Sequence, residues 1–138
     1  MQAATGTYVF DQRRHEERER LVAMEDLWDA GTKAVIESLG IEPGRRCLEV
    51  GAGGGSIATW LAAKVEPAGE VLATDISTRH LDVVDRPNVE VRRHDILGDP
   101  LPEEGFDLVH ARLVVEHLGR RALERMAAAV RPGGWVVL

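Results

Sequence analysis

Short apolar runs alternate with helically spaced apolar residues over the last hundred residues of the chain. The runs predict strands at residues 47–50, 71–74, 89–91, 106–109 and 135–138. The intervening segments predict helices, including a brief one after Ser77, and the two longer ones have apolar faces formed by Ile57, Trp60, Leu61, Val65, Leu123, Met126, Ala127 and Val130. Strands that alternate with helix-length connections favour a parallel sheet covered on both faces. We therefore predict an α/β fold, a doubly wound and mostly parallel sheet of about five strands.

Residues 1–39 follow a different pattern. Leu21, Met24, Leu27 and Trp28 lie at helical spacing behind a run of mixed charge. A glycine at position 31 interrupts this spacing and predicts a second short helix before residue 40. We expect a helical extension over residues 1–39, a core domain over residues 40–138, and all three tryptophans packed in the interior.

Composition narrows the class of protein. The 138 residues are 44% hydrophobic and 29% charged, with a formal net charge of -6, which is typical of a globular domain. The acidic balance disfavours nucleic acid as a partner. The chain has no run of ~20 apolar residues, so we expect no membrane span. Its single Cys47 excludes an internal disulfide and favours the cytoplasm, and no spacing of ligands predicts a metal site.

A glycine-rich loop follows the first predicted strand. Four of the five residues from Gly51 to Gly55 are glycine, and Ser56 then opens a helix. Glycine permits positive φ and lets a ligand approach the backbone, while a helix start offers unpaired N–H groups. A tight turn without a ligand is the alternative, but four glycines exceed what a turn requires. The loop therefore predicts a ligand site.

Acidic residues follow the next two predicted strands. Asp75 is placed to accept hydrogen bonds from both hydroxyls of a ribose, and Ile76 offers an apolar surface to a base. Asp95 and Ile96 follow the third strand, where a carboxylate suits the exocyclic amine of adenine. A helix-start charge beside Ser77 is the alternative role for Asp75. Together with the loop, these residues predict an adenosine ligand.

The ordered motifs resemble those of class I S-adenosylmethionine-dependent methyltransferases, particularly bacterial members that act on small molecules. The similarity covers residues 40–138 and rests on LEVGAGGGS, ATDIS, RHDI, FDLVHARLVVEHL and RPGGWVVL. The resemblance implies S-adenosyl-L-methionine as cofactor and S-adenosyl-L-homocysteine as product. It also implies a cofactor site formed by Glu49, Gly51, Ala52, Gly53, Asp75, Ile76, Asp95, Ile96 and the backbone of His110 and Ala111.

The resemblance also implies which part of the cofactor each residue contacts. Glu49 and the loop hold the methionine and ribose portions, Asp75 the ribose hydroxyls, and residues 95–96 the adenine edge. Methyl transfer to a small-molecule acceptor is an in-line displacement that depends mainly on positioning. No catalytic residue is identified by the sequence, although His117 and then His110 are the histidines to test as a base.

Two other functions stay open. One is a nucleotide-dependent oxidoreductase of Rossmann type, which the incomplete glycine fingerprint disfavours. The other is a truncated cofactor-binding domain without turnover, because the family sheet has two more strands and this chain stops at Leu138. Such a chain would expose its fifth strand, so we expect a possible homo-oligomer through that edge or the N-terminal helices. Tyr8 and Phe10 are candidates for a lid or a simple anchor.

Overall fold

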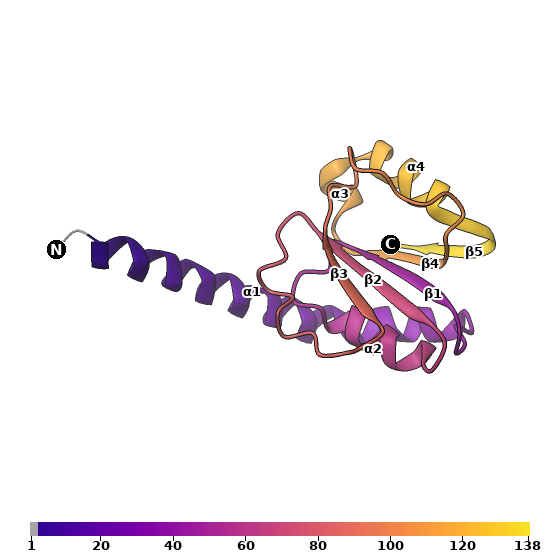
Figure 1. Ribbon diagram of the computed structural model, residues 1–138, viewed down its shortest axis with the longest axis horizontal. Coiled ribbons are helices and arrows are strands. Elements are labelled where there is room, and N and C mark those ends of the chain that lie inside the picture. The colour runs from indigo at the N-terminus through magenta and orange to yellow at the C-terminus, as the bar shows by residue number, and fades with distance from the viewer. Residues whose placement is uncertain (1–2) are drawn as a thin grey trace.

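The computed structural model describes the backbone of residues 3–138 and the side chains of residues 12–138. Its centre is a parallel sheet in the order β3-β2-β1-β4-β5 (Figure 1). The strands are β1 Arg46–Val50, β2 Glu70–Asp75, β3 Val89–Arg93, β4 Phe106–Ala111 and β5 Val130–Val137. The chain winds outward from β1 to β3 and then returns to β4 beside β1. The predicted α/β fold with five parallel strands is confirmed.

Helices cover both faces of the sheet. On one face α1 (Ala3–Ser38) and α2 (Ser56–Val65) pack in a core cluster with Ile36, Leu61 and Leu108. On the other face α4 (Arg120–Ala129), preceded by the short α3 (Val115–Leu118), packs in a second cluster that includes Val109 and Met126. Successive side chains of a strand point to opposite faces of the sheet, so each central strand contributes side chains to both core clusters. Figure 1 shows this arrangement of layers.

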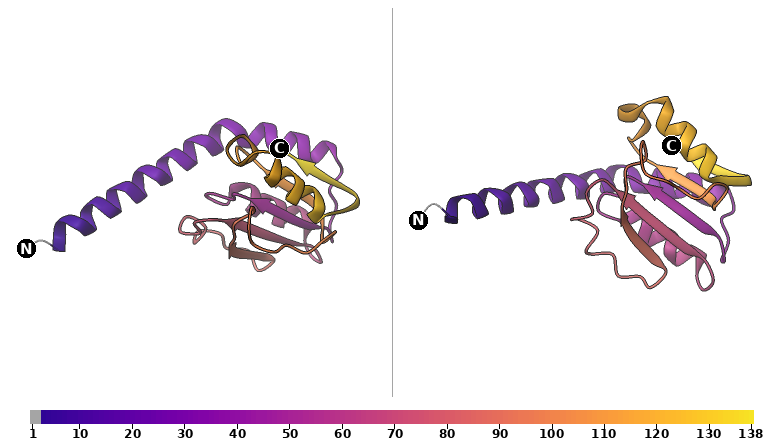
Figure 2. Two further views of the ribbon diagram at one scale, coloured as in Figure 1. Left: turned by 90° about the horizontal axis from the view of Figure 1, so that it is seen from above. Right: turned by 45° about the horizontal axis from the view of Figure 1, so that its top comes forward.

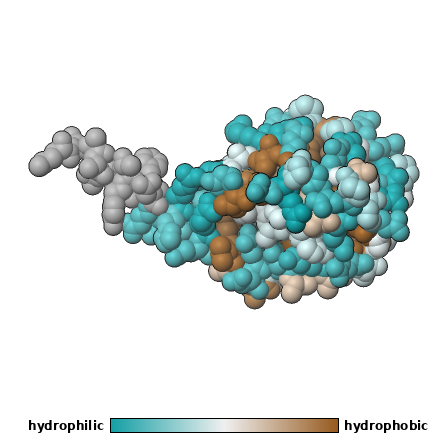
Figure 3. Space-filling model, turned by 60° about the horizontal axis from the view of Figure 1, so that its bottom comes forward, coloured by the Kyte–Doolittle hydropathy of each residue, from teal (hydrophilic) through white to brown (hydrophobic). Residues whose placement is uncertain are grey.

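Helix α1 is continuous, so the predicted interruption at Gly31 is wrong. A glycine inside a helix costs about 1 kcal/mol relative to alanine, which the packing of Ile36 on the core offsets. The N-terminal end of α1 projects away from the sheet (Figure 2), and apolar residues gather beside its junction with the rest of the molecule (Figure 3). No helix within residues 3–138 is long and apolar enough to cross a membrane.

Two of the three tryptophans do not lie in the core, contrary to prediction. Trp28 on α1 and Trp135 on β5 are each 48% exposed, and Leu27 is 72% exposed. The inward face of α1 is formed by buried Ile36, by half-buried Leu21 and Met24, and by several polar residues. Helical spacing alone therefore identified the helix but assigned part of its buried face incorrectly.

The connection between β2 and β3 contains turns instead of the predicted short helix. This connection is fastened to α1 by ion pairs. Glu17 lies 2.6 Å from Arg79, and Arg18 lies 3.2 Å from Asp82. Although such exposed pairs contribute little stability one by one, the set holds the connection beside the N-terminal half of α1.

Strand β5 begins earlier than the predicted strand at residues 135–138 and includes residues 131–134. Phe106 of β4 pairs with Val130, whereas Leu108 pairs with Trp135, so β5 contains an irregularity with Gly133 at a φ of 84°. Beyond it the strand resumes and forms an edge of the sheet. Self-association through this edge stays a prediction.

Candidate functional site

The glycine-rich loop between β1 and α2 has the left-handed backbone that its composition predicts. Gly51, Gly53 and Gly55 have φ angles of 70°, 58° and 82°. A Cβ atom at Gly51 would lie 2.7 Å from the side chain of Val114, and one at Gly53 would lie 3.2 Å from Leu21. The loop therefore needs glycine both for its conformation and for the close approach of α1 and of the segment after β4.

Asp75 joins this loop to the end of β2. Its Oδ2 accepts the N–H of Gly53 at 2.9 Å and its Oδ1 accepts the N–H of Ser77 at 3.1 Å. The N–H of Ala52 donates to the carbonyl of Thr74 at 2.9 Å. Each carboxylate oxygen keeps a second lone pair for a ligand. Asp75 and the glycine-rich loop are thus brought together, while the ribose contact stays a prediction.

A cavity of about 200 Å³, here the strand-end cavity, opens beyond the carboxyl ends of β1, β2 and β3. Gly51, Asp75, Ile76 and Ile96, which are all among the predicted site residues, line this cavity together. Ile96 is buried beneath it, whereas Ile76 is 57% exposed at its rim. His117, on α3, also lines this cavity, so the first candidate base lies beside Asp75 and Ile76.

The third strand end differs from expectation in detail. Asp95 is exposed, and its Oδ1 accepts the N–H of Leu97 at 2.9 Å within a local turn. The neighbouring His94 is buried and lines the strand-end cavity, while its Nε2 donates to the carbonyl of Pro100 at 3.1 Å. Recognition of adenine by Asp95 stays a prediction. The pattern of apolar runs contained no signal for His94.

A second, smaller cavity of about 50 Å³ lies under α1 on the other side of the glycine-rich loop. Gly51 lines both cavities, so they meet at the loop. Ala52, Gly53 and Glu49 line this helix-covered cavity, and α1 contributes Glu25, whose carboxylate lies against Gly54 at the start of α2. A Cβ at Gly54 would collide with this carboxylate.

Acidic groups dominate the helix-covered cavity. Burial, then the charge of nearby Asp29, raises the pKa of Glu25, and Arg112 opposes this rise. Arg112 lines the same cavity and is itself bound by Asp29 at 3.0 Å and by Thr32 Oγ1 at 3.2 Å. Asp29 neutralises the charge of Arg112. The carboxyl groups of Glu25 and Glu49 therefore make the cavity suited to a cationic group. Glu25, Asp29 and Arg112 were not among the predicted site residues.

Glu49 and His110 form a buried pair. They are register partners on the adjacent strands β1 and β4, and the ring Nδ1 lies 2.6 Å from Glu49 Oε2. Their side chains are 5% and 2% exposed. Burial raises the pKa of Glu49, and the nearby His110 opposes that rise. Ala111, also predicted for the site, is buried in the second core cluster behind this pair.

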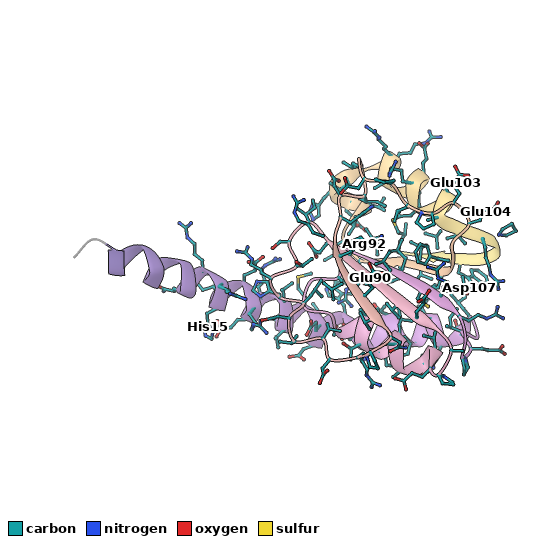
Figure 4. All side chains as sticks on the ribbon, viewed as in Figure 1. His15, Glu90, Arg92, Glu103, Glu104 and Asp107 are labelled. Carbon is teal, nitrogen blue, oxygen red and sulfur yellow. The ribbon has the colours of Figure 1, made fainter. Side chains whose placement is uncertain are left out.

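The amino ends of the strands contain a separate set of charges. Asp107 Oδ2 accepts the N–H of Arg46 at 2.7 Å and also pairs with Arg131, which ties β4 to β1 and β5. Glu90 and Arg92 pair at 2.6 Å on the edge strand β3 (Figure 4). The contacts of Asp107 join neighbouring strands, whereas Glu90 and Arg92 lie two residues apart on β3.

Three further points of the sequence prediction concern Cys47, metal binding, and the aromatic residues Tyr8 and Phe10. Cys47 is fully buried in β1, as expected of a small strand residue. Within the part of the chain whose side chains are described, no group of three His, Cys, Asp or Glu residues gathers as a metal site. Tyr8 and Phe10 lie outside the residues whose side chains are described.

Comparison with known sequences identifies similar proteins. The family model described as a methyltransferase domain matches residues 48–138. Methyltransferase str2 of Strobilurus tenacellus is 41% identical over 101 residues, covering 68% of this chain and 34% of str2. The ubiquinone/menaquinone biosynthesis C-methyltransferase UbiE of Cupriavidus necator is 33% identical over 123 residues, covering 83% of this chain and 49% of UbiE. The chain therefore spans about a third to a half of these relatives.

Comparison with solved structures gives the same fold. A methyltransferase from Geobacter sulfurreducens, solved in complex with S-adenosyl-L-homocysteine, matches with a TM-score of 0.60 at 20% identity. The match covers 76% of this chain and 45% of that protein.

Proposed function

The chain belongs to the family of S-adenosylmethionine-dependent methyltransferase domains, and on this basis we propose that it transfers a methyl group to a small-molecule acceptor. In this proposal adenosine occupies the strand-end cavity and the methionine portion approaches the helix-covered cavity. Bound S-adenosylmethionine supplies an electrophilic methyl group on a sulfonium. The protein binds and orients the reactants and excludes water.

The observation that supports this proposal best is the charge at the start of α2. In dinucleotide enzymes a helix start after a glycine-rich loop receives a pyrophosphate. Here the carboxylate of Glu25 lies against Gly54 at that point, and Glu49 lies nearby in the same cavity. Two carboxylates repel a pyrophosphate but attract an ammonium or sulfonium group. The site therefore favours S-adenosylmethionine over a nicotinamide dinucleotide.

Asp75 links the two portions of the proposed ligand. It accepts the Gly53 N–H and lines the strand-end cavity, so its free lone pairs suit the ribose hydroxyls. Glu49, Gly51, Ala52 and Gly53 would then hold the methionine side. A small-molecule acceptor accords with the role in ubiquinone and menaquinone biosynthesis named for UbiE.

Calorimetric titration with S-adenosyl-L-homocysteine tests the proposal. Asp75→Asn replaces a charged acceptor of the ribose hydroxyls, and hydrogen bonds to charged groups contribute about 1.5–3 kcal/mol. The dissociation constant should therefore rise by about 10- to 100-fold. Asp85→Asn is the matched control, because Asp85 is an exposed residue of the same connection and should leave affinity unchanged. A folded protein that does not bind S-adenosyl-L-homocysteine but binds reduced nicotinamide dinucleotide would contradict the proposal.

A further inference from the structure

A third cavity, of about 440 Å³, lies beside the ends of β4 and β5 and is larger than either cavity of the proposed cofactor site. Its apolar lining includes Trp28 and Val35 of α1, Leu113 after β4, and Val137 of β5. Trp28 and Val35 are about half exposed, at 48% and 50%. We call this space the aromatic-lined cavity.

The wall of this cavity is shared with the cofactor site. Arg112 lines both the aromatic-lined and the helix-covered cavity, and Leu113 lines both the aromatic-lined and the strand-end cavity. Leu113 has a φ of 60°, a strained backbone conformation for a residue other than glycine. A molecule in the aromatic-lined cavity therefore lies against Arg112 and Leu113, which also border the proposed cofactor site.

His110 connects the two sides chemically. Its ring lines the aromatic-lined cavity, while Glu49 lines the helix-covered cavity. When Glu49 is ionised it only accepts hydrogen bonds, and in that state His110 donates from Nδ1 to Glu49 and keeps a lone pair on Nε2. A base oriented by a buried acid is an arrangement suited to removing a proton from a nucleophile.

Besides His110, the lining includes two charged side chains, Arg112 and Glu116, and Arg112 is already neutralised. Arg112 Nη1 lies 3.0 Å from Asp29, so it offers no free charge to an anionic ligand. The apolar lining and the Trp28 ring suit a flat, uncharged molecule, and the lone pair of His110 suits one acidic proton on it.

We propose that the aromatic-lined cavity binds an aromatic hydroxyl compound as methyl acceptor and that His110, held by Glu49, is its catalytic base. This inference rests on the proposed methyltransferase function. The hydroxyl proton moves to His110 Nε2 as the oxygen–methyl bond forms and the sulfonium–methyl bond breaks. The electron pair of the broken bond stays on sulfur, giving a neutral thioether, and the imidazolium then releases its proton to water.

The probe for this proposal is 4-nitrophenol, whose phenolate absorbs visible light, added to protein saturated with S-adenosyl-L-homocysteine so that no turnover occurs. Binding should quench the fluorescence of Trp28, and Trp28→Ala should weaken binding at least fivefold. The pKa of the bound phenol should be lower in the wild type than in His110→Asn by about one to two units, because a nearby imidazolium stabilises the phenolate.

His110→Asn is chosen because its side-chain amide can still donate a hydrogen bond to Glu49 but offers no basic nitrogen. Glu49→Gln should reduce the shift in the same direction, since it removes the charge that stabilises the imidazolium. His15→Asn is the control, because His15 is an exposed histidine of α1 that lines none of the three cavities and should leave the probe unchanged. His110→Asn leaves the buried carboxylate of Glu49 without its partner and could lose native circular dichroism for that reason. In that case the double variant His110→Asn/Glu49→Gln removes this charge, and the pKa of its bound phenol is compared with that in the wild type.

Each result decides one part of the proposal. A phenol pKa equal in wild type and His110→Asn overturns the role of His110 as base. Binding that does not quench Trp28, or no binding of the probe, overturns the aromatic site. If S-adenosyl-L-homocysteine does not bind but the probe alone still quenches Trp28 and shows the pKa difference between wild type and His110→Asn, only the proposed cofactor function is overturned.

Discussion

Gly51→Ala tests whether the close contact between the glycine-rich loop and the segment after β4 is required for stability. Gly51 has a φ of 70°, and a Cβ there would lie 2.7 Å from Val114 Cγ2. Gly44→Ala is the matched comparison, because Gly44 has a φ of 89° and a Cβ there would meet no atom within 4 Å. The two substitutions share backbone strain and differ in the overlap.

The magnitudes follow from this difference. Left-handed conformation costs a residue other than glycine about 1–2 kcal/mol, partly offset by about 0.4–1 kcal/mol from the stiffer unfolded chain. Gly44→Ala should therefore lower the free energy of unfolding by about 1 kcal/mol. At Gly51 the overlap with Val114 adds about 1–3 kcal/mol of overpacking.

Urea denaturation followed by circular dichroism measures both changes, with equal slopes required for the comparison. The double variant Gly51→Ala/Val114→Ala removes the methyl group that the new Cβ would meet. Its destabilisation should be about 1–2 kcal/mol smaller than the sum of the two single changes. Equal destabilisation by Gly51→Ala and Gly44→Ala, or strict additivity in the double variant, would show that the overlap with Val114 is not what makes glycine necessary.

Two further predictions concern titrating groups. A hydrogen bond from His80 holds the pKa of Glu17 below its ordinary value of 4.5, so Glu17 stabilises the fold above that value and loses this contribution as pH falls through the lowered pKa. Glu17→Gln should be less stable than wild type near neutral pH in urea titrations, with the gap narrowing in acid; a gap that is independent of pH would contradict this. Burial raises the pKa of Cys47 to about 12, so iodoacetamide at mildly alkaline pH should leave the native protein unmodified by mass spectrometry while alkylating it in urea. Equal labelling rates in the two states would contradict the buried strand position.

The glycine-rich loop and the order of secondary-structure elements were predictable because their signals are local. Glycines at 51, 53 and 55 do adopt positive φ, and Asp75 does meet the loop. The contact between Asp75 and the loop follows from the topology, since the carboxyl ends of parallel strands lie at the same edge of the sheet. The exposed position of Asp95 was not predictable, because its turn with Leu97 competes with ligand recognition within the same few residues.

The polar face of α1 shows why part of the site escaped prediction. The helix was recognised from apolar residues at helical spacing, yet Leu27 and Trp28 lie largely in solvent while Glu25 and Asp29 face the glycine-rich loop and Arg112. Hydrophobic periodicity identifies a helix, but the angle at which that helix crosses the sheet decides which polar side chains turn inward.

The pair formed by Glu49 and His110 also shows the difference between what the sequence predicts and what the fold decides. Each residue was expected near the cofactor, but they are 61 positions apart and meet because the chain, after winding to β3, returns to place β4 beside β1. The alternating elements, the glycine-rich loop and the acid at the end of β2 could be read from the chain alone, because local periodicity and backbone sterics act within a few residues. The acidic cavity under α1, the buried pair and the aromatic-lined cavity exist only in the folded molecule, because burial and charge pairing depend on groups that the fold brings together from distant parts of the chain.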